Sequence, residues 1–295
     1  MGTTWSAAFT HPRVGAEPAL ATVQAALDGV VAQMSPWEPG SDLNRYNRAP
    51  AGAWIDLPDD LLFVLDASLQ IAAQTDGAFD PTLGALTDLW GFGPVAFRGA
   101  PPTADEVAAA VAVSGWRRLM REGSRLLQPG GLGLDLGGVA KGFGVDKAVD
   151  ALLALGVANA LVEVGGELKG VGAKPDGSPW WAAVEADEAG AEPDTVAALS
   201  GWALATSADH RRAFIHDGLR YGHTLDPAAG VPRRTPTLSA SVLHTSCMLA
   251  DAYATAALVM APEAALRLAE REHLALRLTG ADGAAGSRRF QAYAS

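Results

Sequence analysis

The sequence predicts an α+β fold in which mixed sheets are flanked by helices. Expected strands cluster in the second half of the chain, and helices interrupt them irregularly, whereas a doubly wound sheet would alternate the two. The chain has 295 residues with 49% hydrophobic content, which is enough to form a sizeable core. Two interleaved lobes would suit the same length, but we expect one domain over residues 1–295.

Proline and a capping box mark the helices expected in the first half. Pro18 and Pro58 each stand in the first turn of an expected helix, where the missing N–H is tolerated. Thr103 and Glu106 have the spacing of a capping box, which predicts another helix start. The expected elements are a strand at 3–9 and helices at 18–32, 58–75, 103–113 and 139–155.

The second half carries most of the expected strands. The pair Asp217-Gly218 favours a two-residue hairpin turn between short strands. Residues 187–194 are acidic and rich in Ala and Gly, which predicts a mobile surface loop. The other expected elements are strands at 160–164, 180–185, 202–206 and 238–244, helices at 246–260 and after Pro262, and closing strands at 274–278 and 290–293.

The segment at residues 135–142, Asp-Leu-Gly-Gly-Val-Ala-Lys-Gly, is rich in glycine and opens an expected helix. Free amides and the positive end of the helix dipole could receive a phosphate there, with Lys141 reaching a phosphate oxygen. No G-x-G-x-x-G register fits the segment, and Ala140 precedes the lysine where a P-loop has glycine. The alternative is a tight turn between a strand and a helix that needs glycine for its backbone conformation.

Asp251 and Thr255 are four residues apart in an expected helix, so their side chains project from one face about a turn apart. Two hard oxygen ligands suit Mg²⁺, which commonly takes few protein ligands and leaves its other positions to water and substrate phosphate. The alternative is that the aspartate lies near the helix N-terminus and the threonine bonds back to its own helix.

His223 follows the second strand of the expected hairpin and precedes the turn at Asp226-Pro227. A histidine in that place could act as a general base near neutral pH. The alternative is a surface or structural histidine without a chemical role.

Taken together, these segments resemble the ApbE family of FAD:protein FMN transferases, from the first residues to the helix at Asp251. The resemblance rests on many blocks that occur in the same order. The blocks are 1–5, 34–37, 41–43, Asn47, 76–82, 89–93, 135–142, 162–167, 205–207, 223–232 and 250–255. The chain departs from the usual family pattern at Ala208, His210 and Ala228-Ala229.

The resemblance implies a single flavin transferase domain of the ApbE type, related to the T-fold. It also implies a Mg²⁺-dependent enzyme that cleaves the pyrophosphate of FAD and releases AMP. FMN would be joined through a phosphoester bond to a Ser or Thr hydroxyl of an acceptor protein. Two alternatives stay open: an FAD pyrophosphatase that uses water as the acceptor, and an FAD carrier without turnover.

The resemblance also assigns roles to individual residues of this chain. Asp251 and Thr255 match side-chain metal ligands, and Gly138 matches a position whose backbone carbonyl completes the metal site. His223 matches the base that takes the proton from the acceptor hydroxyl. The positions that match contacts to the flavin nucleotide are Met1, Trp37, Ala78, Phe79, Asp80, Asp135 and Lys141. Turn-forming neighbours place Trp37 on a loop, where its ring could stack on the flavin or adenine.

Composition excludes several other classes of protein. The net charge of −11 argues against a general nucleic-acid surface. The histidines and the single cysteine lack zinc-site spacing, and a lone cysteine forms no intrachain disulfide. No run approaches the roughly 20 apolar residues of a membrane span, and no signal segment is visible. We therefore expect a cytoplasmic protein, or an exported one if a leader was removed.

Overall fold

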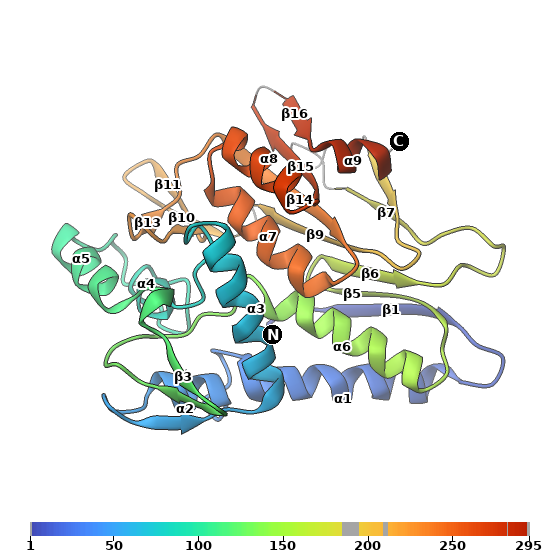
Figure 1. The fold of residues 1–295 in the computed structure, drawn as a ribbon, viewed down its shortest axis with the longest axis horizontal. Helices are drawn as coiled ribbons and strands as arrows, with labels where there is room; N and C mark the ends of the chain where they lie inside the picture. The colour runs from blue at the N-terminus through green and yellow to red at the C-terminus, as the bar shows by residue number, and fades with distance from the viewer. Residues whose placement is uncertain (1, 185–194, 209–211, 282, 294–295) are drawn as a thin grey trace. The chain divides into compact units, whose positions relative to one another are not determined.

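The computed structural model describes residues 2–184, 195–208, 212–281 and 283–293 (Figure 1). Met1, a predicted nucleotide contact, and the predicted loop at 187–194 lie outside the described residues. Contacts divide the chain into two units. The first comprises Met1–Val30, Gly138–Ala208 and Thr235–Ser295, and the second comprises Val31–Gly137 and Asp209–Arg234.

A seven-stranded sheet forms the centre of the first unit, in the order β1-β5-β6-β9-β14-β15-β16. Its strands are β1 (Trp5–Thr10), β5 (Asn159–Val164), β6 (Glu167–Val171), β9 (Ala203–Ala208), β14 (Thr237–His244), β15 (Ala275–Gly280) and β16 (Gly283–Gly286). All neighbouring strands in this sheet run antiparallel. The predicted α+β fold is therefore confirmed, because a doubly wound sheet is mostly parallel.

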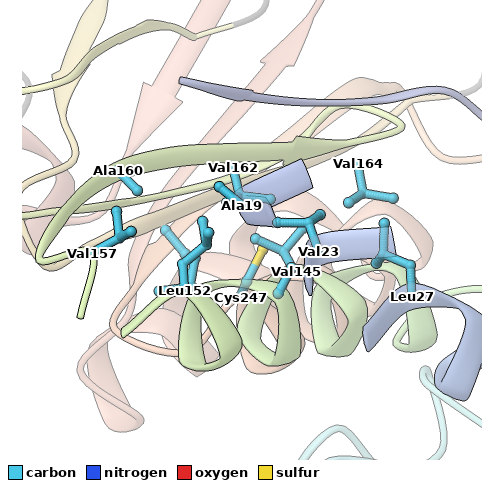
Figure 2. Close-up of a cluster of buried hydrophobic side chains, with 13 residues drawn as sticks. Ala19, Val23, Leu27, Val145, Leu152, Val157, Ala160, Val162, Val164 and Cys247 are labelled. Atoms are coloured by element: carbon cyan, nitrogen blue, oxygen red, sulfur yellow. The ribbon is translucent and has the colours of Figure 1, made fainter. Parts of the chain in front are cut away.

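Helices of the first unit cover one face of this sheet. They are α1 (Ala16–Met34), which ends beyond the unit boundary, α6 (Ala140–Ala154), α7 (Cys247–Val259) and α8 (Pro262–Arg271). Helix α9 (Arg288–Tyr293) instead contributes Phe290 to the cluster on the opposite face. Figure 2 shows Val162 of β5, Val23 of α1, Val145 of α6 and Cys247 of α7 in one buried cluster. Helices α6 and α7 also contact each other directly.

The opposite face of the sheet is buried as well. Alternate residues of a strand point to opposite faces, so Leu161 of β5 points away from the helix cluster. It packs with Trp180 and Leu199, which flank a small hairpin. The hairpin consists of β7 (Trp181–Ala183) and β8 (Val196–Ala198).

The second unit combines short helices with small antiparallel sheets. Its elements are α2 (Asp42–Asn47), β2 (Trp54–Asp56), α3 (Asp59–Gln74), α4 (Gly84–Leu89), α5 (Ala104–Val113), the 3-10 helix η1 (Trp116–Arg118), β3 (Met120–Glu122), β4 (Arg125–Leu127), β10 (Ala213–His216), β11 (Leu219–Gly222), β12 (Leu225–Asp226) and β13 (Val231–Pro232). Aromatic rings fill one of its clusters: Phe214 of β10 stacks on Phe97 at 4.0 Å and on Tyr221 at 5.0 Å between ring centres.

Two turn signals in the sequence are confirmed at atomic detail. Thr103 accepts from the backbone of Glu106 while the Glu106 side chain accepts from Thr103, which completes the capping box of α5. Asp217 and Gly218 have φ angles of 49° and 75°, so both occupy the left-handed region that a tight hairpin turn requires.

Two local predictions are wrong. The closing segment predicted as a strand at 290–293 belongs to helix α9, because Ser287 Oγ accepts from Phe290 N at 3.3 Å and supports a helical turn. Pro58 is the N-cap of α3 and does not lie within its first turn.

Candidate functional site

Helix α7 carries two of the predicted metal ligands, Asp251 and Thr255. The helix begins after Ser246, whose side chain accepts from Leu249 N as an N-cap. Asp251 is 1% exposed, and its Oδ2 accepts from Gly142 N at 3.1 Å. The Thr255 hydroxyl lies 3.1 Å from Ser207 Oγ on β9. Neither side chain bonds back to its own helix in these contacts, so both are directed toward neighbouring elements.

Glycine at positions 138 and 142 lets the backbone approach α7 closely. A Cβ added to Gly138 would lie 2.8 Å from Thr255 Oγ1, so the structure brings this predicted ligand against the threonine hydroxyl. A Cβ at Gly142 would lie 2.3 Å from the carbonyl oxygen of Cys247 and 2.9 Å from Asp251 Cβ. The small residues around Lys141 therefore set the spacing between the start of α6 and α7.

Lys141 lies between two buried carboxylates. Its Nζ is 2.6 Å from Glu167 Oε1 and 3.4 Å from Asp251 Oδ1. Burial alone would lower the pKa of Lys141, but the charges of Asp251 and Glu167 outweigh it and raise that pKa above its usual value. Lys141 is therefore a permanent cation with hydrogens available for a further acceptor.

Glu167 was not among the residues predicted for the site. Burial raises its pKa to about 7, although Lys141 opposes the shift. Its Oε2 is buried and has no hydrogen-bond partner among the described residues. Two carboxylates share one lysine here, so the charge of Asp251 adds to the effect of burial in favouring the protonated form of Glu167.

Two ionised carboxylates beside one lysine leave a net negative charge, which favours the binding of a further cation. Among the described residues, no three His, Cys, Asp or Glu side chains form a group that could hold a metal ion. The donors that the first unit offers are instead a carboxylate, a threonine hydroxyl and a closely approaching glycine backbone. Such a sparse set of hard oxygens fits Mg²⁺, which needs only one or two carboxylates from the protein. The residues present therefore fit the predicted metal.

His223 is held by the backbone of the second unit. It follows β11, and both its backbone N and its ring Nδ1 lie 3.1 Å from the carbonyl oxygen of Arg212. A carbonyl only accepts, so Nδ1 carries a hydrogen, and whenever the ring is neutral its lone pair is on Nε2. The ring also meets Phe92 edge to face, with 6.4 Å between ring centres. This tautomer is the one that presents Nε2 as a base.

Trp37 lies on the loop between α1 and α2, as its neighbours predicted, and is 49% exposed. Its backbone N donates to Ser35 Oγ at 3.2 Å, and the guanidinium carbon of Arg212 lies 5.4 Å from the centre of its ring. An exposed indole with a cation beside it can also accept a planar ring.

The run Ala78-Phe79-Asp80 is held tightly within the second unit. Phe79 is buried, and its backbone N donates to Thr75 Oγ1 at 3.2 Å. Asp80 accepts from the backbone and hydroxyl of Thr82 and from Trp116 N. Burial raises the pKa of Asp80 against these hydrogen bonds. These contacts support the loop, and contact of the run with a nucleotide stays a prediction.

Asp135 likewise has partners inside the second unit. Its Oδ2 accepts from Thr87 Oγ1 at 2.6 Å, and its Oδ1 accepts from Gly137 N at 2.9 Å. The carboxylate thus stabilises the glycine-rich turn that leads into α6. A tight turn of this kind was the alternative to a phosphate-binding loop for residues 135–142. Its contact with a nucleotide stays a prediction.

The predicted residues fall into two groups. The first unit holds Gly138, Lys141, Asp251 and Thr255 together with Glu167, and the second unit holds Trp37, Ala78, Phe79, Asp80, Asp135 and His223. Sequence reasoning missed Glu167 and Ser207 as partners of Lys141 and Thr255. Both stand in blocks that carry the family resemblance, but only contacts between distant segments show which residues they meet.

Gly142→Ala tests the close packing of α6 on α7. The added Cβ would collide with backbone atoms of Cys247, which cannot move aside as a side chain can. We expect a loss of at least about 1–3 kcal/mol in the free energy of unfolding, measured by denaturant titration.

Gly29→Ala is the matched control, because no atom lies within 4 Å of a Cβ at that position in α1. It should instead stabilise the protein by about 0.5–1 kcal/mol, since alanine is the better helix former. Equal effects of the two substitutions would contradict the packing described for Gly142.

The chain is similar to proteins of one family over almost its whole length. A family model described as the ApbE family matches residues 1–278. A protein named FAD:protein FMN transferase from Vibrio cholerae serotype O1 is 35% identical over 278 residues, which cover 93% of this chain and 83% of that protein. A protein of the same name from Haemophilus influenzae is 32% identical over 264 residues, with coverage of 87% and 76%.

Solved structures show the same similarity. The apo crystal structure of Pseudomonas stutzeri flavinyl transferase ApbE matches with a TM-score of 0.90 and 36% identity, covering 100% of this chain and 95% of that chain. The Vibrio cholerae flavin transferase ApbE matches with a TM-score of 0.91 and 32% identity, covering 99% and 96%. Both sequence identities are high enough to indicate a shared family as well as a shared fold.

Proposed function

Because the chain belongs to the ApbE family, we propose that it is a flavin transferase that moves FMN from FAD to a Ser or Thr hydroxyl of an acceptor protein. The proposal is supported by whole-length similarity to proteins named FAD:protein FMN transferase. The observation that carries it is the cluster of Lys141, Glu167, Asp251 and Thr255. This cluster combines a fixed cation, excess negative charge and a hydroxyl beside a glycine backbone.

The proposed reaction is a transfer of a phosphoryl group. The acceptor hydroxyl oxygen forms a bond to the phosphorus of the FMN half of FAD, and the bond from that phosphorus to the bridging oxygen breaks. AMP leaves with the bridging oxygen, and the product is a phosphoester between FMN and the acceptor. The hydroxyl proton passes to Nε2 of His223, which carries the lone pair in the tautomer described above.

Residues of α6 and α7 would bind and orient the pyrophosphate of FAD. Lys141 has a raised pKa and stays charged, so it would hold a phosphate oxygen in addition to its two carboxylates. Asp251, Thr255 and the Gly138 carbonyl would hold Mg²⁺. When bound, that ion neutralises charge on the phosphate oxygens. Trp37 would stack on a ring of FAD.

Product analysis tests the proposed function against the two alternatives. The protein is incubated with FAD and Mg²⁺, with and without candidate acceptor proteins, and both AMP and flavin-labelled protein are followed. Transfer gives AMP together with labelled acceptor, hydrolysis gives AMP and free FMN, and a carrier gives neither. AMP release without labelling of any acceptor would replace the transferase proposal with the pyrophosphatase.

Location and domain organisation stay predictions. Among the described residues, no helix combines the length and the apolar character of a membrane span. We propose that the two units of the chain act as one catalytic domain, since the family model spans both of them.

Trp37→Ala is expected to weaken FAD binding by about 1–3 kcal/mol, on the scale of base stacking on an aromatic ring. Because the side chain is 49% exposed, the melting temperature without ligand should hardly change. FAD affinity can be measured by fluorescence quenching, and stability by thermal unfolding.

Trp54→Ala is a suitable control, because this tryptophan of β2 is 38% exposed and also lies beside an arginine. It should leave FAD affinity unchanged. If Trp37→Ala melts much earlier yet binds FAD normally, the tryptophan supports the fold and does not stack on the ligand.

A further inference from the structure

Asp146 of α6 binds the start of α7 through three hydrogen bonds. Its Oδ1 accepts from Cys247 N at 3.0 Å, and its Oδ2 accepts from Met248 N at 3.0 Å and from Ser246 Oγ at 2.8 Å. The first amides of a helix have no partner within the helix, and a negative charge there is favoured by the helix dipole. A residue of one helix thus caps another helix about 100 residues further along the chain.

Asp146 also pairs with Lys169 of β6. The Nζ of Lys169 lies 2.6 Å from Asp146 Oδ1, and both side chains are only 15% exposed. Solvent therefore screens this ion pair much less than a surface pair. One carboxylate joins three elements: α6, β6 and α7.

The same three elements carry the proposed catalytic cluster. Lys141 lies on α6 five residues before Asp146, and Glu167 begins β6 two residues before Lys169. Asp251 follows Cys247 by four residues, or about 6 Å along the axis of α7. The Asp146 contacts therefore hold the three elements within about one to two turns of Lys141, Glu167, Asp251 and Thr255.

We propose that Asp146, together with Lys169, is a positioning residue that holds Asp251 and Thr255 in the geometry that binds Mg²⁺; this inference rests on the proposed function. The close contact of Gly142 with α7 fixes the distance between α6 and α7. Four donors converge on Asp146, and only a carboxylate has enough acceptor sites for them. Asparagine offers one carbonyl oxygen and adds two donors.

Metal binding by Asp146→Asn tests the inference. Mn²⁺ is titrated into the full-length protein, with and without FAD, and the concentration of free Mn²⁺ is followed by electron paramagnetic resonance. Mg²⁺ is then added as a competitor. We expect the dissociation constant of Asp146→Asn to rise about 10- to 100-fold, the range seen when residues that orient metal ligands are changed. Lys169→Met should weaken metal binding less than Asp146→Asn does. Lys169→Arg, which keeps the positive charge, should bind the metal with the affinity of the parent.

Val149→Ala separates positioning from general stability. Val149 is buried on the same helix, and its loss lowers stability through the core without removing a hydrogen bond to α7. Its metal affinity should equal that of the parent even where its melting temperature falls as far as that of Asp146→Asn. Parent-like affinity in Asp146→Asn, or an equal loss of affinity in Val149→Ala, would overturn the inference. A parent that binds neither ion, with or without FAD, overturns the proposed metal site itself.

Discussion

Asp251→Asn and Asp251→Ala are expected to lower Mg²⁺-dependent AMP release from FAD by about a thousandfold or more, because a lost metal contact removes several kcal/mol of charge stabilisation. Both variants leave Lys141 with one carboxylate fewer. Because Asp251 is buried, the alanine variant also leaves a cavity and should be less stable. The asparagine variant keeps the volume of the side chain. Initial rates at saturating Mg²⁺ and thermal unfolding, measured on both variants, separate the two effects.

Asp176→Asn provides a comparison at an exposed carboxylate of the same unit, where its partner is Ser178. Its turnover should match that of the parent. If Asp251→Asn turns over FAD at the parent rate, Asp251 is not a metal ligand, and the fold and family assignment are unaffected.

His223→Ala is expected to retain FAD binding but to slow transfer to the acceptor by roughly 10²- to 10⁴-fold, the usual loss when a general base is removed. The physical reason is the tautomer: Nδ1 donates to the Arg212 carbonyl, so Nε2 is the atom that can take a proton. Single-turnover rates across neutral pH and FAD affinity measure the two effects separately.

His216 of the same hairpin is the matched control, since its partner is Asp217 at 3.4 Å and the proposed reaction does not use it. His216→Ala should transfer at the parent rate. Equal rates in His223→Ala and the parent would remove His223 from the mechanism, and a collapse of FAD affinity would make it a binding residue instead.

Local signals in the sequence account for much of the fold. The capping box predicted α5, the Asp217-Gly218 pair predicted the hairpin, and the irregular order of strands and helices predicted the α+β class. These features depend on residues that are close in the sequence, so they can be predicted without knowing which distant segments pack together. The segment at 290–293 was predicted wrongly because its apolar residues suit a strand, while the Ser287 contact that supports a helix was not recognised.

The candidate site was predictable in its residue types but not in its contacts. Asp251, Thr255, Lys141 and Gly138 were identified from spacing and family resemblance, and the first unit holds all four. Glu167 was missed because its place in the cluster depends on a 2.6 Å contact with Lys141, which is 26 residues away in the sequence. Pairings over such separations depend on how strands and helices pack, which no short sequence pattern expresses.

The assembly of the first unit from three separate stretches has a consequence for biosynthesis. Its sheet pairs β1, at the start of the chain, with β5 some 150 residues later, and α7 and β14 come from the last stretch. Contacts between residues far apart in sequence form slowly, because long loops must close first. During synthesis, β1 and α1 lack their packing partners until α6 and β5 have emerged, and the sheet is completed only when residues beyond 235 follow. We therefore expect the second unit, most of which is continuous, to acquire structure during translation, and the catalytic cluster to form only near release of the chain.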